Sequence, residues 1–245
     1  MTAPRRGFAL LAVLWLVVAL GALAAGATLH ARADAAVTGD RVLAMRGRWA
    51  AEGCLVVALA RLDGALRARR AFAPPALDTL TFANGARCEA QAIDPGTRLR
   101  RDSVGAGIIG RLDSLLAARG DTSAPARDTL LTEYGDGRVN VNAAPAVVLA
   151  ALPGFGPEAL RFMREARAWG RPLTDLGALA WQLSPSARNA LLEHYGELAG
   201  LTTFATTSLV ITARGWVDGN RPSATIEVLV VNAGTRAAVV RRRMW

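Results

Sequence analysis

An uncharged apolar run near the start of the chain constrains the fold most. Residues 8–29 read FALLAVLWLVVALGALAAGATL and contain no charged side chain. As an α-helix rising ~1.5 Å per residue, the run would be about 33 Å long, enough to cross the hydrocarbon core of a bilayer. Arg5 and Arg6 lie directly before it. Because positive charge is retained in the cytoplasm, we expect a single-pass membrane protein whose remaining chain lies outside the cytoplasm.

Three interpretations of this run are open. A secretory signal peptide would be cut near Ala31–Ala33, whose ARA sequence has a small–x–small form, although the run is longer than the apolar region of most such peptides. A plain membrane anchor would keep the run uncut. The third interpretation depends on the junction Gly7–Phe8, where a short basic leader ends in glycine immediately before the apolar residues.

The helix is expected to continue past the membrane to about Arg70. No proline interrupts residues 31–70, and adjacent prolines in FAPPAL at 72–77 then end the helix. Four leucines recur in the second half at intervals of four, three and four residues: Leu55, Leu59, Leu62 and Leu66. This spacing places them on one helical face, which predicts that this face packs on a soluble domain.

Strands are predicted on both sides of a helical block. The expected strands cover residues 78–84, 86–94, 207–217, 223–231 and 237–245. Asn84-Gly85 is a strong hairpin signal between the first two, and a loop at 218–222 separates the next pair. We therefore expect an α+β fold in which a long N-terminal helix packs on one small antiparallel sheet. The helical block would be an all-helical domain inserted into that sheet.

The block itself predicts several short helices. In its first part we expect one helix at 108–120, followed by a turn-rich loop at 121–128. In its second part, Asn142 would cap a helix that starts at Ala143. A tight hairpin, LPGFGPE, follows at 152–158, with its key residues at Pro153, Gly154, Gly156 and Pro157. Another helix would end at Gly170, and two more would follow the cap-type residues Thr174 and Ser184.

The two cysteines lie on different expected elements. Cys54 is on the long helix and Cys88 is in the second strand. In an oxidising compartment a disulfide between them would close a loop of about 34 residues and stabilise the fold by roughly 4 kcal/mol. The alternative is a pair of small buried thiols that never meet.

The hairpin resembles the tandem helix-hairpin-helix domains of competence DNA receptors, in which glycines let the backbone approach a phosphate. The charge on residues 139–200 argues against that use. Five arginines, Arg161, Arg164, Arg167, Arg171 and Arg188, are balanced by five acids, Glu158, Glu165, Asp175, Glu193 and Glu197. The chain's formal net charge of +9 lies elsewhere, largely before residue 70 and at Arg241–Arg243. Since phosphate neutralisation dominates non-specific DNA binding, the neutral charge of this module argues against nucleic acid as a partner.

The junction Gly7–Phe8 resembles the leader of type IV pilins and type II secretion pseudopilins. In those families prepilin peptidase cuts after the glycine, and the new N-terminal phenylalanine is N-methylated. Most members carry Glu at the fifth mature position, where this chain has Ala12. A carboxylate inside a membrane needs a partner, and minor pseudopilin K typically has an apolar residue there instead. The stretch GRVNVNA at Gly137–Ala143 resembles a Gly-x-x-Asn-x-Asn element in the helical domain inserted into pseudopilin K.

This resemblance to the type II secretion minor pseudopilin K family implies a subunit at the tip of a periplasmic pseudopilus, anchored in the bacterial inner membrane. It would help to initiate pseudopilus assembly and protein secretion across the outer membrane. Implied partners are other minor pseudopilins, prepilin peptidase, and a secreted substrate or the outer-membrane channel. The implied organisation is a leader (1–7), a transmembrane helix (8–29), a periplasmic helix with the first strands (30–95), the inserted domain (96–200) and the last strands (201–245). The alternative is a membrane-tethered helix-hairpin-helix protein that binds DNA for uptake.

Pseudopilin K domains can bind calcium, so the resemblance also implies candidate calcium ligands at Asp94, Asp102, Glu133 and Asp136. Their spacing matches no calcium loop, and we expect no cofactor. The sequence contains no P-loop, no Gly-x-Ser-x-Gly, no zinc-type spacing and no Cys/His pair with an evident orienting group. We therefore expect a structural protein rather than an enzyme.

Overall fold

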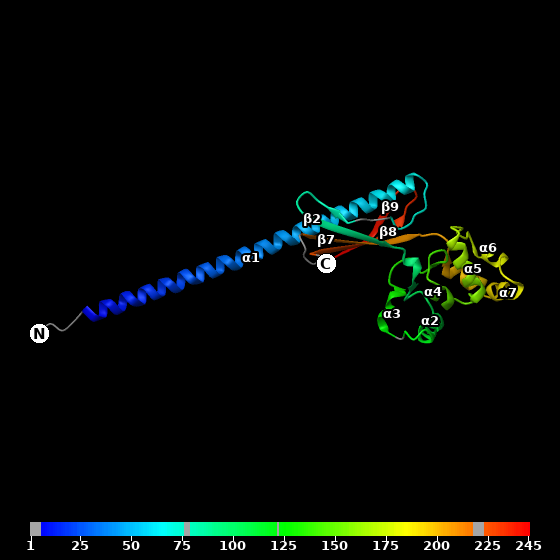
Figure 1. Cartoon of the computed structure of the whole chain (residues 1–245), viewed down its shortest axis with the longest axis horizontal. Helices are drawn as coiled ribbons and strands as arrows, with labels where there is room; N and C mark the ends of the chain where they lie inside the picture. The colour runs from blue at the N-terminus through cyan, green and yellow to red at the C-terminus, as the bar shows by residue number, and fades with distance from the viewer. Residues whose placement is uncertain (1–5, 76–78, 122, 218–222) are drawn as a thin grey trace.

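The structure is a computed structural model that describes residues 6–75, 79–121, 123–217 and 223–245. The leader positions 1–5, the start of the first expected strand at 78, and the expected loop at 218–222 therefore lie outside the described residues. The N-terminal half of a single long helix, α1 (Arg6–Arg67), projects far from the rest of the molecule, as Figure 1 shows. By length and composition it is the one helix among the described residues that could cross a membrane.

The second half of α1 packs on a sheet, as the leucine spacing predicts. Leu55, Leu62 and Leu66 are buried there, and Leu59 packs partly buried against the same core. Every residue of the N-terminal part from Leu10 to Arg46 is exposed. This part of α1 is called the stalk, and the remainder of the helix packs on the sheet.

One antiparallel sheet is formed by strands that precede the helical block and strands that follow it. Its order is β1 (Leu80–Thr81), β2 (Ala86–Ile93), β7 (Ser208–Val217), β8 (Ala224–Asn232) and β9 (Ala237–Met244). Strand β2 lies beside β7, with Cys88 opposite Gly215 and Ile93 opposite Val210. The prediction of one sheet interrupted by a helical block is confirmed. Gly85 adopts a left-handed φ of 78° in the turn between β1 and β2, where the sequence places the Asn-Gly hairpin.

Alternating residues of the sheet give it one buried face. In β7 and β8, Ile211, Ala213, Ile226, Val228 and Val230 are buried beneath α1, while the residues between them are more exposed. This is the two-residue period expected of a sheet covered on one side.

The chain between β2 and β7 forms the inserted domain. It contains a 3-10 turn η1 (Pro95–Thr97), β3 (Leu99–Arg100), α2 (Ala106–Ala118), α3 (Ala124–Thr129), β4 (Leu131–Thr132), β5 (Val139–Asn140), α4 (Ala146–Ala151), α5 (Pro157–Ala168), α6 (Leu176–Trp181), α7 (Pro185–Glu193), α8 (Tyr195–Leu201) and β6 (Thr202–Thr203). The strands form two small parallel pairs, β3 with β4 and β5 with β6.

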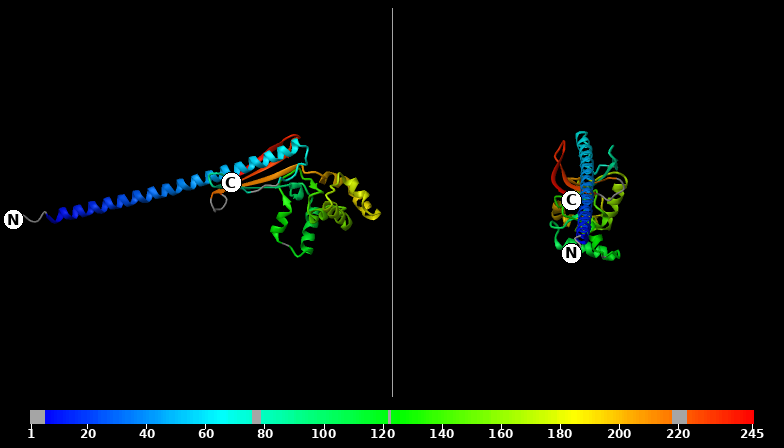
Figure 2. Two further views of the ribbon diagram at one scale, coloured as in Figure 1. Left: turned by 45° about the horizontal axis from the view of Figure 1, so that its top comes forward. Right: turned by 90° about the vertical axis from the view of Figure 1, so that its left-hand side faces the viewer.

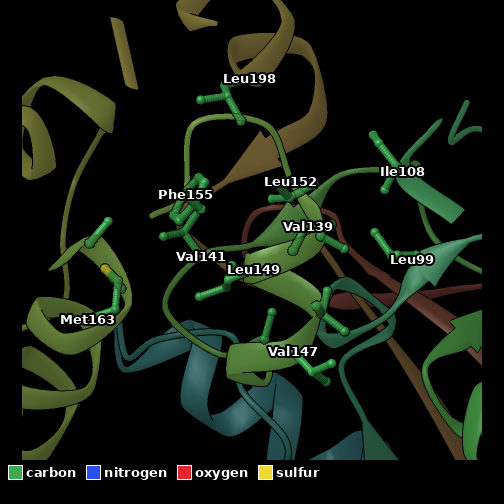
Figure 3. Close-up of a cluster of buried hydrophobic side chains, with 14 of the residues drawn as sticks. Leu99, Ile108, Val139, Val141, Val147, Leu149, Leu152, Phe155, Met163 and Leu198 are labelled. Atoms are coloured by element: carbon green, nitrogen blue, oxygen red, sulfur yellow. The ribbon is translucent and has the colours of Figure 1, made fainter. Parts of the chain in front are cut away.

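The inserted domain has a hydrophobic core separate from that of the sheet. Figure 3 shows side chains from several elements gathered around α4, with Leu99, Val139 and Phe155 among those labelled. The domain lies beyond the sheet, at the end of the molecule opposite the free stalk of α1 (Figures 1 and 2).

Several local predictions were wrong. Residues expected as a loop at 121–128 include the start of α3, because Ser123 caps that helix by accepting from the Ala126 N–H. The helix expected from Ala143 begins at Ala146. Asp175, not Thr174, caps α6 by accepting from the Ala178 N–H. The helix after Ser184 is divided at His194 into α7 and α8.

Candidate functional site

The candidate processing site lies at the free end of α1. Gly7 and Phe8 belong to the first described turns of this helix, and Ala12 is exposed on it with apolar neighbours. Because position 12 is alanine, the apolar segment of α1 at residues 8–29 contains no carboxylate. Cleavage after Gly7 and methylation of Phe8 remain predictions.

Cys54 and Cys88 are joined by a disulfide that connects α1 to β2. Their Cα atoms are 6.1 Å apart, and both side chains are buried in the core between helix and sheet. The bond attaches α1 covalently to the sheet. Disulfides persist in oxidising compartments, which is in keeping with a domain outside the cytoplasm.

The hairpin of the inserted domain faces another helix of the same domain. Gly154 has a φ of 73°, and a Cβ there would lie 2.9 Å from the Ala190 carbonyl oxygen and 3.1 Å from Leu191 Cα. Pro153 is buried on the same turn. The close approach that a phosphate would need is therefore occupied by α7. A Cβ at Gly156 would meet nothing within 4 Å, and Gly156 precedes Pro157 at the start of α5.

A fixed negative charge occupies the start of α5. The Ser184 backbone N–H donates to Glu158 Oε1 at 2.8 Å, and the Ser184 hydroxyl donates to Oε2 at 2.7 Å. These hydrogen bonds, the hydroxyl's above all, lower the pKa of Glu158, so the carboxylate stays ionised. An anion from nucleic acid would meet this carboxylate at the helix N-terminus.

Two of the module's five arginines are used inside it. Arg167 Nη2 donates to the carbonyl oxygens of Val141 and Ala144, each at 2.7 Å. Burial of this guanidinium lowers the pKa of Arg167. Arg188 Nε donates to the Ala180 carbonyl oxygen at 3.0 Å, and its guanidinium lies 5.0 Å from the centre of the Trp181 ring. Arg167 and Arg188 are therefore less available to bind a phosphate of nucleic acid.

Asn140, the first asparagine of the VNVN stretch, belongs to a buried network where the chain leaves and re-enters the sheet. Its Nδ2 donates to Asp94 Oδ2 at 2.8 Å, and the Thr206 hydroxyl donates to the same oxygen at 2.8 Å. Asp94 Oδ1 accepts from the Gly96 N–H at 2.8 Å. Asp94 follows β2 and Thr206 precedes β7, so the network joins the two connections to the inserted domain.

Asn142, the second asparagine, is a clamp rather than the predicted helix cap. Its Nδ2 donates to the carbonyl oxygens of Leu173, at 2.8 Å, and Phe204, at 2.7 Å. Its Oδ1 accepts from the Leu173 N–H at 2.9 Å. Three segments of the inserted domain are thereby held together by one side chain.

The structure does not bring the four calcium candidates together. Asp94 is committed to the network with Asn140, and Asp102 pairs with Arg100 at 2.8 Å. The hydrogen bond from Arg100 lowers the pKa of Asp102. Asp136 accepts from the Arg138 N–H, and Glu133 is exposed. Over the described part of the chain, no three His, Cys, Asp or Glu side chains form a group able to hold a metal ion. These residues do not fit a calcium site.

Tyr134 makes a contact that sequence reasoning missed. Its hydroxyl donates to Glu227 Oε1 on β8, and Arg243 Nη1 donates to the hydroxyl oxygen at 3.3 Å. The guanidinium groups of Arg241 and Arg243 lie 5.5 Å and 5.9 Å from the ring centre. Burial, together with the neighbouring Glu227 carboxylate, raises the pKa of Tyr134. The inserted domain is thus attached to the sheet here as well as at Asp94.

The comparisons with known proteins identify a fold. No known family model matches the chain, and no curated protein matches its sequence. One solved structure that matches is the crystal structure of the GspK–GspI–GspJ complex from the type 2 secretion system of enterotoxigenic Escherichia coli. The TM-score is 0.55 at 13% sequence identity, over 88% of this chain and 99% of that chain. The fold-level resemblance to pseudopilin K is confirmed: this chain has the α+β, pilin-like fold found in that secretion complex.

Proposed function

We propose that this chain is a minor pseudopilin of the K type, acting at the tip of a type II secretion pseudopilus. The observation that carries the proposal is one continuous helix, α1, whose apolar stalk leads directly into a disulfide-linked sheet bearing a separate domain at its far end. A subunit of this shape can be anchored by its stalk while its bulk projects away from the membrane.

The position of the inserted domain supports the tip. Filament subunits that pack through their N-terminal helices must leave room along the filament axis for the next subunit. Here a domain with its own core extends beyond the sheet, opposite the stalk (Figure 2). Such a domain obstructs the addition of a subunit above it. We infer that the chain begins the pseudopilus and caps it, and thereby helps to initiate assembly.

The residue at position 12 supports the same role. In related filaments a glutamate at this mature position pairs with the terminal amine of a neighbour, which offsets the cost of burying both charges. Ala12 cannot make that pair. A subunit with nothing stacked above it does not need one.

The proposed partners follow from the shape. Other minor pseudopilins would pack against α1, and the inserted domain would meet a secreted protein or the outer-membrane channel. Prepilin peptidase would cut the chain at Gly7–Phe8 on the cytoplasmic face of the inner membrane. The remaining domain would lie in the periplasm, where the bond between Cys54 and Cys88 is stable.

Deleting the gene and measuring protein secretion tests this role. We expect secreted proteins to accumulate in the periplasm, and pseudopili to be lost when the major subunit is expressed at its native level. The intact gene should restore both. Normal secretion combined with lost DNA uptake would instead favour a membrane-tethered DNA receptor.

A further inference from the structure

Helix α1 has a second apolar stripe, separate from the face that packs on the sheet. Val42, Met45, Trp49 and Val56 follow one another at intervals of three, four and seven residues. All four are exposed, and the Trp49 side chain is 70% exposed. Intervals of three and four are the spacing of a helix–helix seam. The described residues of this chain leave that seam uncovered.

Strand β9 forms a wall along one side of this stripe. It descends along α1: the Ala237 N–H donates to Asp63 Oδ1 at 2.6 Å, and further down Arg242 pairs with Glu52. Below that pair, Met244 and Trp245 border a hollow of about 380 Å³ that is also lined by Met45 and Arg48. Stripe and wall together make a groove, which we call the α1–β9 groove.

The walls of the α1–β9 groove are unusually apolar for a solvated surface. Trp245 is 64% exposed, and Met244 and Val240 are exposed on the same strand. Exposed tryptophan and methionine side chains that gather beside a hollow mark an interaction site more often than a bare surface.

Distance from the apolar run argues against a lipid occupant. Met45 lies 16 positions beyond Leu29, so at ~1.5 Å per residue it is about 24 Å further along the helix. An upright stalk therefore holds the groove well above the headgroups. Tryptophans that anchor proteins in a bilayer lie at the membrane boundary instead.

The charges and direction of the groove define its occupant. Arg41, Arg46 and Arg48 flank the stripe and are exposed, so a partner with carboxylates beside its apolar seam would be complementary. The stripe runs along α1, and the same helix leads down to the apolar run at residues 8–29. A helix rising from the same membrane, parallel to α1, would follow it without bending.

We propose that the α1–β9 groove receives the N-terminal helix of a second membrane-anchored protein, apolar along its seam and acidic at its flanks. This inference rests on the proposed function, and it adds that the last strand forms half of the seat. The partner helix then contacts one side of α1 only, which fixes where the neighbour lies around this subunit.

Photo-cross-linking in the full-length, membrane-embedded chain tests the groove. A benzophenone amino acid is placed singly at Thr38, which is exposed on the stalk four residues before Val42, at Met244 on the β9 wall, and at Gln91, which is exposed on β2, as the control. Thr38 and Met244 should both cross-link to peptides from one membrane-anchored protein, mapping to its helix just beyond its apolar segment. Gln91 should not.

The outcomes separate the two proposals. Cross-linking from Thr38 without cross-linking from Met244 overturns the groove and leaves the proposed function standing. No cross-link to any membrane-anchored protein from either site overturns both. Cross-links from Met244 to lipid or to a second copy of this chain overturn the proposed occupant.

A charge substitution provides the second measurement. Met45→Glu places a carboxylate in the groove opposite an acidic partner, so cross-linking from Met244 should fall at least about tenfold. Gln91→Glu adds the same charge elsewhere and should leave it unchanged. Met45 is exposed, so the fold should tolerate the substitution, as an unchanged melting temperature would show. Undiminished cross-linking in Met45→Glu would contradict the groove.

Discussion

The hydroxyl of Tyr134 donates a hydrogen bond to the carboxylate of Glu227, and this bond joins the inserted domain to the centre of β8. The two residues are 93 positions apart in sequence. With Arg241 and Arg243 beside the ring, the contact holds the domain at a second point in addition to the Asp94 network. The orientation of the inserted domain on the sheet is therefore fixed by side chains as well as by the two connecting segments.

Replacing Tyr134 by phenylalanine should weaken this attachment. The loss of one hydrogen bond to a charged, partly exposed acceptor costs about 1 kcal/mol. Because the folded state raises the pKa of Tyr134 above 10.0, the tyrosine's contribution is complete below pH 10 and is lost as pH rises through the raised value. Urea unfolding of the detergent-solubilised chain between pH 8 and pH 11 checks this. The wild type should lose more stability than Tyr134→Phe over that range, and equal losses would rule out the link.

Gly215 should not tolerate a side chain. A Cβ there would overlap the carbonyl oxygen of Gly47 and come within 2.6 Å of the Ala51 nitrogen, both on the backbone of α1. Backbone atoms cannot move aside cheaply, so Gly215→Ala should destabilise the fold by about 3 kcal/mol or more. Gly64→Ala, on an open face of α1, is the matched control and should stabilise by roughly 0.5 kcal/mol. Thermal melts that rank the two variants alike would disprove this close packing.

The two hairpin glycines should respond differently to alanine. Gly154 needs a left-handed φ and meets Ala190, so Gly154→Ala should cost about 2 kcal/mol. Gly156 has a φ of −77° and open space, so Gly156→Ala should be within about 0.5 kcal/mol of wild type. Denaturant unfolding of both variants provides the comparison. If Gly154→Ala folds normally, the packing of the hairpin on α7 is not the reason for the glycine.

Breaking the disulfide should loosen α1 from β2. Replacing Cys54 and Cys88 together by alanine removes a cross-link between residues 34 positions apart, a loss of roughly 4 kcal/mol by the chain-entropy account. Protease digestion of the folded protein should then cut the segment between α1 and β2 faster. Wild type treated with a reductant should behave like the double variant, and protection equal to oxidised wild type would contradict the assignment.

Elements with a strong local pattern could be predicted from sequence. The leucine spacing located the packed face of α1, and Asn84-Gly85 located the first hairpin of the sheet. The roles of asparagine were harder to assign, because one side chain can cap a helix or bind a distant carbonyl. Asn142 binds Leu173 and Phe204, 31 and 62 positions away, and no local signal distinguishes that from a cap.

The contact that attaches the inserted domain to the sheet could not be predicted either, because it joins residues far apart in the sequence that carry no local signal. Tyr134 lies in a segment without clear periodicity, and its partner Glu227 is one of several alternating polar residues on β8. Only the folded sheet brings β8 and β9 next to that tyrosine. The exposed stripe on α1 was present in the sequence, but its significance depends on which face the sheet leaves uncovered.

Analysis of the mature N-terminus tests the central claim most directly. The protein is purified from membranes of its native host, or of a host with an active type II secretion system, and its N-terminal peptide is examined by mass spectrometry. A pseudopilin should begin at N-methylated Phe8, and a Gly7→Val variant should retain the leader. A mature protein that begins at Asp34, as after signal-peptide cleavage, or an intact Met1 in wild type, would contradict the account.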